Sequence, residues 1–216
     1  CFNVNINGTL NLLEFLRKKK IISFNLISSV GVLSKSNSLP ISEKALYGPT
    51  TPYAASKMSA ESILQAYGDC YNLPYHITRL FNVYGPGKYG LVISDLIKKL
   101  ILNQNELEIH GDGEQIRDFL FIDDVVKGIE LVSLKGLNKN IYHLASGKPI
   151  SINKLASSII QYLGLKDVKI IHTNTHFNGE FKRWYGDNTK LKKIGFKSTT
   201  SLKAGLIKTI DWFKNK

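Results

Sequence analysis

The stretch that most constrains this chain is Thr51-Pro52-Tyr53-Ala54-Ala55-Ser56-Lys57. Proline at the first position of a helix costs no hydrogen bond and threonine before it can cap the helix, so a helix is predicted to begin here. Tyr53 and Lys57 then lie one turn apart on one face. A phenol is a poor base near neutral pH, but an ammonium group beside a phenol favours the phenolate. Taken alone, such a pair is more often an ordinary helix start than a catalytic site.

Segments typical of strands and helices alternate along the first 145 residues, which predicts an α/β fold with a parallel sheet and helices on both faces. Apolar runs rich in branched residues, or short alternating runs, predict strands. These runs are 21–29, 75–81, 107–109, 115–122, 141–145 and 168–172. Helical spacing and capping residues predict helices. These are 4–18, 51–71, 91–102, 151–163 and 201–213, with others starting at Asp123 and Asp187. Residues 30–50 and 82–90 are expected to be loop and turn.

Composition limits the class of protein and its partners. Hydrophobic residues make up 43% and charged residues 21% of 216, as in soluble globular proteins, and no apolar run approaches the length of a membrane span. Two cysteines and no signal-peptide pattern favour a reducing cytoplasm. The formal charge of +12 is interpreted as a solvated lysine coat, because no zinc-finger or RNA-binding signature accompanies it. Neither a membrane nor a nucleic-acid partner is expected.

Further motifs follow one another along the whole chain. They are Asn5-Ile6-Asn7-Gly8-Thr9, Ser28-Ser29, Tyr53-x-x-x-Lys57, Arg79-Leu80-Phe81-Asn82-Val83-Tyr84-Gly85-Pro86-Gly87, Gly111-Asp112-Gly113-x-x-x-Arg117-Asp118-Phe119, Asp123-Asp124-Val125-Val126 and Ser146-Gly147. In this order and spacing, the chain resembles the NAD-dependent epimerase/dehydratase family, extended short-chain dehydrogenases that act on nucleotide sugars. The resemblance covers essentially all 216 residues.

The family begins with a strand and a phosphate-binding loop of the form G-x-x-G-x-x-G, which does not occur where the resemblance starts. The sole methionine, Met58, follows Tyr53, so an N-terminal segment is expected to precede Cys1. Residues 85–90 do match G-x-G-x-x-G. Pro86, however, removes a backbone donor that a pyrophosphate would need. The resemblance instead places this loop beside the sugar nucleotide.

The resemblance implies a Rossmann-like doubly wound parallel sheet, N-terminally incomplete, with a smaller α/β substrate-binding domain. The dinucleotide-binding part would be 1–82 with 119–146, and the nucleotide-sugar part 83–118 with 147–216. It also implies a nicotinamide cofactor. Both NAD and NADP stay open, because the segment that discriminates between them precedes the resemblance. A homodimer formed by a four-helix bundle is expected, from the helices that begin near Asn5 and Thr51.

By position in the family, Tyr53 would be the general base or acid on a sugar oxygen, and Ser29 would hydrogen-bond the same oxygen. Lys57 would hold the nicotinamide ribose and favour the phenolate. Asn5, Ser28 and Leu80 would complete the cofactor site. A strand-end cap is the alternative for Ser29, and a helix cap is an equally good alternative for Asn5.

Asn82, Arg117 and Arg183 would bind the substrate, the arginines at its diphosphate, for which guanidinium geometry is suited. Aromatic side chains next to Arg183 are interpreted as core residues. No metal is expected. Two histidines and a glutamate have metal-like spacing for a helix, but the asparagines and glycine between them favour a solvated loop. They are His172, His176 and Glu180.

The resemblance favours a UDP-glucose 4-epimerase-like enzyme, with a nucleotide-sugar 4-keto reductase or dehydratase as alternatives. The dehydratase branch carries Thr-Asp-Glu where this chain has Ser29-Val30-Gly31, so elimination would lack its acid and base. The family's Tyr-Gly is replaced by Leu33-Ser34, which leaves sugar contacts there open. A non-catalytic sugar-nucleotide-binding fragment is the alternative of another class.

Overall fold

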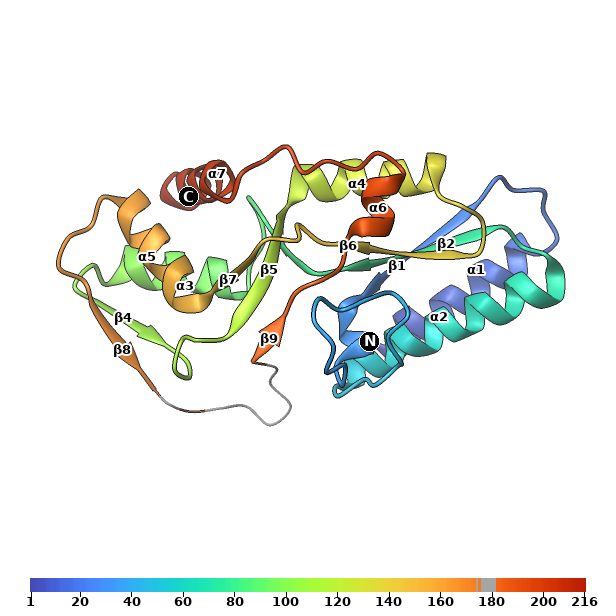
Figure 1. The fold of residues 1–216 in the computed structure, drawn as a ribbon, viewed down its shortest axis with the longest axis horizontal. Coiled ribbons are helices and arrows are strands. Elements are labelled where there is room, and N and C mark those ends of the chain that lie inside the picture. Colours follow the sequence, from blue (N-terminus) through green and yellow to red (C-terminus); the bar gives the residue numbers. More distant parts are fainter. Residues whose placement is uncertain (174, 176–181) are drawn as a thin grey trace.

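The computed structural model describes residues 1–173, 175 and 182–216 (Figure 1). Three parallel strands in the order β1-β2-β6 form its first sheet. The middle strand, β2, is buried over five of its six residues, as expected for a strand covered on both faces. The strands are β1 (Phe24–Ser29), β2 (Tyr75–Leu80) and β6 (Asn140–Leu144).

Helices cover both faces of this sheet. In Figure 1, α1 and α2 lie on one side, and α4 and α6 lie on the other. The longest helix, α2, begins as predicted, with Pro52 as its first residue and Thr51 Oγ1 accepting the Ala54 N–H at 3.1 Å. The prediction of an α/β fold with a doubly wound parallel sheet is confirmed. The helices are η1 (Asn3–Asn7, a π-helix), α1 (Gly8–Leu16), α2 (Pro52–Tyr71), α4 (Ile122–Lys135) and α6 (Thr189–Lys193).

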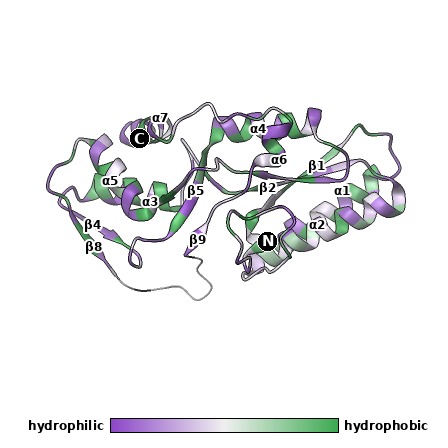
Figure 2. Ribbon diagram, viewed as in Figure 1, coloured by the Kyte–Doolittle hydropathy of each residue, from purple (hydrophilic) through white to green (hydrophobic). Residues whose placement is uncertain are grey.

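A second group of elements has its own apolar core, to which α3, α5 and α7 contribute. Figure 2 marks hydrophobic residues along α3 and α5, and Ile97, Leu155 and Leu206 are fully buried between the helices. The elements are α3 (Val92–Leu102), β4 (Glu106–Ile109), α5 (Ile152–Leu163), β8 (Lys169–His172) and α7 (Leu202–Lys214). Strands β4 and β8 pair in parallel. The separate apolar cores favour a division of the chain into two domains. The boundaries proposed for these domains stay a prediction.

Strand β5 connects the two groups. It pairs in parallel with β3 and β9 and antiparallel with β7. The strands are β3 (Asn82–Tyr84), β5 (Ile116–Phe121), β7 (Pro149–Ser151) and β9 (Arg183–Trp184). The sequence predicted only β5 among them. The others have two or three residues, too few to show a periodic pattern, and pairing with β5 is what makes them strands.

Two local predictions were wrong. The segment 30–50 begins with a 3-10 helix, η2 (Val30–Leu33), and is therefore not loop throughout. The segment 82–90, predicted to be a turn, begins with the strand β3. The prediction that Asp187 caps α6 agrees with the structure, because Asp187 Oδ1 accepts the N–H of Thr189, the first residue of that helix, at 2.8 Å. Among the described residues, none of the helices combines the length and the apolar character that crossing a membrane would require.

Candidate active site

The three residues predicted to be catalytic line one cavity of about 620 Å³. Ser29 is the last residue of β1, and Tyr53 and Lys57 come from the first turns of α2. The cavity therefore lies at the carboxyl end of a parallel strand, where open α/β sheets bind their ligands. Ser28 and Leu80, predicted to contact the cofactor, line the same cavity.

Lys57 is fixed in this cavity by the strand beside it. Its Nζ donates a hydrogen bond to the Ile27 carbonyl at 2.9 Å, which uses one of its three N–H donors. Burial lowers the pKa of Lys57, and the negative charge of Glu61, one turn further along α2, opposes that shift. Tyr53, one turn earlier, keeps 48% of its surface exposed. The ammonium group is thus held close to the sheet while the phenol stays accessible.

The two serines at the end of β1 differ in their hydrogen bonds. Ser29 Oγ accepts the Gly31 N–H at 3.1 Å, as the strand-end cap interpretation predicted, and its own O–H remains a donor. Ser28 is 3% exposed, and its Oγ has no hydrogen-bond partner among the described residues. A buried hydroxyl without a partner is costly, so a ligand that bonds to Ser28 would be favoured.

Asn5 is not among the described residues that line the cavity. Its Nδ2 donates to Ser56 Oγ at 2.9 Å, and Ser56 Oγ donates to the Tyr53 carbonyl at 2.7 Å. Asn5 therefore holds η1 against the turn of α2 that carries Tyr53. A direct contact of Asn5 with a cofactor stays a prediction.

Asn82 and Arg117, predicted to bind the substrate, line both this cavity and a second one of about 420 Å³. Asn82 Nδ2 donates to the Asp118 carbonyl at 2.9 Å, and Arg117 Nη1 donates to the Ile116 carbonyl at 3.0 Å. Arg183 is exposed and is not among the described lining residues, whereas its neighbour Trp184 lines the first cavity. The two cavities thus meet at Asn82 and Arg117.

The first cavity carries positive charge. Lys57, Lys88 and Arg117 line it, and no carboxylate does among the described residues. The sequence analysis did not single out Lys88, although it lies in the glycine-rich loop 85–90. It also missed Gln115, which lines the second cavity and stands two residues before Arg117. Alternation along a strand would have placed Gln115 and Arg117 on one face.

The His172 side chain makes a hydrogen bond to another side chain. Its Nε2 donates to Asn153 Oδ1 at 2.8 Å. His176 and Glu180, the other two residues with metal-like spacing, lie outside the described residues. Within the part of the chain that is described, no three His, Cys, Asp or Glu side chains are grouped to hold a metal ion.

Comparison with known proteins agrees with this architecture. The model of the NAD dependent epimerase/dehydratase family matches residues 1–145. The UDP-glucuronate 4-epimerase of Thermodesulfobacterium geofontis is 36% identical over an alignment 217 positions long, which covers 97% of this chain and 65% of that protein. Other relatives are named dTDP-D-glucose 4,6-dehydratases. The chain spans between 59% and 65% of the length of these curated relatives.

Solved structures give the same result. The UDP-glucuronic acid 4-epimerase of Bacillus cereus, in complex with UDP-glucuronic acid and NAD, is 30% identical to this chain, and the two structures superpose with a TM-score of 0.89. The superposition covers 98% of this chain and 67% of the epimerase chain. RMD from Pseudomonas aeruginosa, complexed with NADPH, is 28% identical and superposes with a TM-score of 0.90. That superposition covers 100% of this chain and 75% of the RMD chain. The sheet and its strand-end cavity define a Rossmann-like α/β protein. More particularly, the chain belongs to the NAD dependent epimerase/dehydratase family.

Proposed function

We propose that this chain is part of an NAD(P)-dependent nucleotide-sugar epimerase similar to UDP-glucose 4-epimerase. The observation that carries the proposal is the single cavity lined by Tyr53, Lys57 and Ser29, which meets a second cavity at Asn82 and Arg117. A sugar in the first cavity and a nucleoside in the second would place the diphosphate between them. There Arg117 offers a guanidinium and Asn82 an amide, groups suited to phosphate oxygens.

The described residues fit the cofactor that the family implies. Bound NAD or NADP would take a hydride from the sugar carbon and return it. The unpaired, buried hydroxyl of Ser28 and the remaining N–H donors of Lys57 are suited to the hydroxyls of a ribose. Leu80 supplies an apolar contact on the same wall. Asn5, through Ser56, keeps the turn with Tyr53 in place.

In the proposed reaction, the phenol of Tyr53 moves the proton. Tyr53 takes the proton from a sugar hydroxyl as the carbon that bears it loses hydride, which leaves a ketone. Ser29 donates its free O–H to the same oxygen. Lys57, as a cation one turn away, favours the phenolate that this step needs. Hydride would return to the opposite face of the carbonyl carbon, and Tyr53 would return the proton to the oxygen, which gives the epimer.

The residues of the cavity favour this reaction over loss of water. A dehydratase needs a carboxylic acid and a base at the sugar, and the described residues that line the first cavity include no carboxylate. A 4-keto reductase would use the same three residues and is the second candidate. The two are separated by cofactor balance, because an epimerase consumes no reduced cofactor and a reductase consumes one per turnover.

Partners and location follow from the same proposal. A nucleotide sugar is the partner that the paired cavities accommodate. Cys1 and Cys70 are both free and exposed, which suits the reducing cytoplasm where we propose the enzyme works.

Tyr53→Phe tests the proposed function in the protein expressed from its whole gene. Removing the hydroxyl removes the acid–base group, so turnover of a UDP-sugar is expected to fall by about 10²- to 10⁴-fold while the affinity for UDP-sugar is kept. Product analysis measures turnover, and calorimetry measures affinity. The control, Tyr71→Phe, changes an exposed tyrosine at the far end of the same helix and should leave both unchanged.

Wild-type turnover in Tyr53→Phe would remove the catalytic assignment. UDP-sugar binding without any turnover in the wild type would favour the non-catalytic alternative.

A further inference from the structure

The loop 85–91 forms part of the wall of both cavities. Lys88 and Leu91 line the first cavity, and Gly90 and Leu91 line the second. Tyr89 stands between these residues in the sequence but is not among the described residues that line either cavity. The loop therefore turns the neighbours of Tyr89 towards the cavities and the Tyr89 side chain elsewhere.

The backbone of this loop does little to fix its own conformation. Gly87 and Gly90 have φ angles of 79° and 73°, in the left-handed region that glycine adopts without steric cost. Apart from the adjoining residues, nothing lies within 4 Å of the place where either glycine would carry a Cβ atom. The N–H groups of Tyr89 and Gly90 have no hydrogen-bond partner among the described residues. Such a backbone has many conformations open to it, so the observed one needs another source of order.

The Tyr89 side chain supplies that order by packing against the end of α7. Its ring centroid lies 5.6 Å from that of Trp212 and 5.5 Å from that of Phe213, both in an edge-to-face arrangement. On α3, Lys98 Nζ lies 4.2 Å from the centroid of the Tyr89 ring, a cation–π contact. Lys216 Nζ donates to the Tyr89 hydroxyl at 3.4 Å. One side chain thus ties the loop to two helices.

This contact adds little to the apolar core. Tyr89 remains 45% exposed and does not belong to the core that α3, α5 and α7 share, whereas Phe213 packs against that core. The contact between Tyr89 and Trp212 therefore acts mainly on the loop. Its consequence is to hold Lys88 and Leu91 where they line the cavities.

We propose that Tyr89, packed against Trp212, holds the loop 85–91 in the conformation that binds the nucleotide sugar. The inference rests on the proposed function, which places a nucleotide sugar in the two cavities. Tyr89 is then a positioning residue, because it acts on the ligand only through its neighbours in the loop. Without the contact, the loop would hold the binding conformation for only a fraction of the time, and the apparent affinity would fall by that fraction.

The first test measures affinity. Calorimetry on the protein expressed from its whole gene gives the Kd for UDP-glucose. Tyr89→Ala should raise this Kd about 5- to 50-fold. Tyr89→Phe keeps the ring and should stay within about twofold of the wild type. Trp212→Ala should match Tyr89→Ala, and the double variant should bind no more weakly than either single variant, because both residues act through one contact.

The matched control is Tyr71→Ala, which should keep the wild-type Kd. Tyr71 is 48% exposed, and its ring centroid lies 5.2 Å from that of Tyr67. The Arg17 guanidinium carbon lies 5.0 Å from the same centroid. Tyr71 therefore has a ring contact and a cation contact like those of Tyr89, but it is not among the described residues that line the two cavities.

The second test measures the order of the loop without any ligand. Trypsin cleaves after lysine, and mass spectrometry measures the rate of cleavage after Lys88. Trp212→Ala leaves the sequence around Lys88 unchanged, yet it should speed this cleavage at least about fivefold, because cleavage follows the population of the released loop. Cleavage at other lysines should keep its wild-type rate. A general loss of stability would instead speed cleavage throughout the chain.

Three results would overturn the inference: a wild-type Kd in Tyr89→Ala, an equal rise of Kd in Tyr89→Phe and Tyr89→Ala, or a Trp212→Ala variant in which cleavage after Lys88 is no faster than in the wild type or speeds up only together with all other sites. In each case the wild type still binds UDP-glucose, so the proposed function stands. If the wild type does not bind UDP-glucose, the proposed function fails and the inference fails with it.

Discussion

His143 is fully buried on β6, where burial and the nearby positive charge of Arg79 lower the pKa of His143 to about 3. Its Nδ1 donates to the Ile41 carbonyl at 3.1 Å, whereas Nε2 has no partner among the described residues. A proton added at Nε2 would therefore lack an acceptor. The folded protein holds this imidazole neutral at pH values where an unfolded chain would protonate it.

This arrangement predicts acid sensitivity. The pKa of His143 in the unfolded chain, about 6.5, lies above its value in the folded protein. The contribution of the neutral His143 side chain to the free energy of unfolding is therefore complete above pH 6.5 and is lost as the pH falls towards 3. The loss should approach about 1.4 kcal/mol per pH unit, or about 2 kcal/mol between pH 6.5 and 5. Urea unfolding at several pH values measures it. His143→Gln should show a flatter dependence in this window, and an equal slope in both proteins would contradict the assignment.

At the scale of elements, a buried ion pair joins α2, β2 and the segment 34–50. Arg79 Nη2 lies 2.7 Å from Glu61 Oε2, and both side chains are almost completely buried. From the segment 34–50, Tyr47 donates its hydroxyl to the same carboxylate oxygen at 2.7 Å, and its ring centroid lies 5.2 Å from the Arg79 guanidinium carbon. The pair thus connects one wall of the first cavity to the helix that carries Tyr53.

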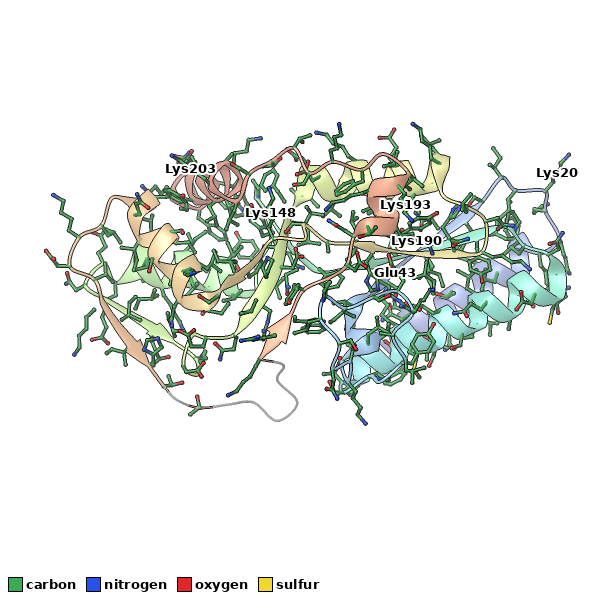
Figure 3. The ribbon with its side chains drawn as sticks, viewed as in Figure 1. Lys20, Glu43, Lys148, Lys190, Lys193 and Lys203 are labelled. Atoms are coloured by element: carbon green, nitrogen blue, oxygen red, sulfur yellow. The ribbon has the colours of Figure 1, made fainter. Side chains whose placement is uncertain are left out.

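The same segment also reaches β6 and α6. Glu43 Oε1 accepts a hydrogen bond from the backbone N–H of His143 at 3.1 Å, and Arg79 Nη1 donates to the Glu43 carbonyl at 3.3 Å. Figure 3 labels Glu43 and, beside it in this view, Lys190 of α6. Burial lowers the pKa of Lys190, and the charge of Glu43 opposes that change. The segment is therefore held by several charged groups.

Removing one partner of the buried pair is expected to be more damaging than removing both. Arg79→Met leaves Glu61 buried without its cation, which should lower the free energy of unfolding by about 3–5 kcal/mol. Adding Glu61→Met should recover much of that loss, because no uncompensated charge remains. Urea denaturation measures each step.

The exposed pair Lys139–Asp69, with 3.0 Å between its charged atoms, is the comparison. Lys139→Met should cost less than about 1 kcal/mol. A similar cost for Arg79→Met would show that the buried charge is compensated in another way.

At the scale of the whole molecule, α1 and the neighbouring η1 present an apolar surface. Hydrophobic residues recur along α1 in Figure 2, and Val4, Leu12 and Phe15 are more than half exposed. Tyr71 of α2 is 48% exposed. Apolar surface that gathers on adjacent helices is typical of an interaction site. This surface fits the homodimer by a four-helix bundle that the family resemblance implies, which stays a prediction.

The double variant Leu12→Glu/Phe15→Glu tests the dimer. Two carboxylates placed in an apolar interface would have to be desolvated, so the dimer Kd should rise at least about 100-fold. Light scattering coupled to size-exclusion chromatography reports the mass over a range of concentrations. Leu134→Glu changes another exposed leucine, on α4, and should not affect the mass. A wild type that is monomeric at all concentrations would contradict the dimer.

Surface charge also belongs to this scale. Figure 3 labels Lys20, Lys193 and Lys203 at distant places on the outside of the molecule. Lysines spread in this way leave their ammonium groups in water, which agrees with the interpretation of the charge as a solvated coat.

Local chemistry made much of this architecture predictable. Thr51 and Pro52 begin α2 for reasons that operate within four residues, and the buried strands β1, β2 and β6 carry their apolar character in their own sequences. The family motifs named several of the residues that line the first cavity, Ser29, Tyr53, Lys57 and Asn82 among them. Their roles stay predictions.

What the sequence determined by itself is the order of the longer helices and strands and the phenol–ammonium pair one turn apart, because these depend on interactions between near neighbours. Only the tertiary structure decided that β3, β7 and β9 are strands, since each needs β5 as a partner from elsewhere in the chain. It alone also showed that Gln115 Oε1 and Ser28 Oγ are buried without partners. Whether a polar atom is paired depends on every segment packed around it, and no local pattern records that.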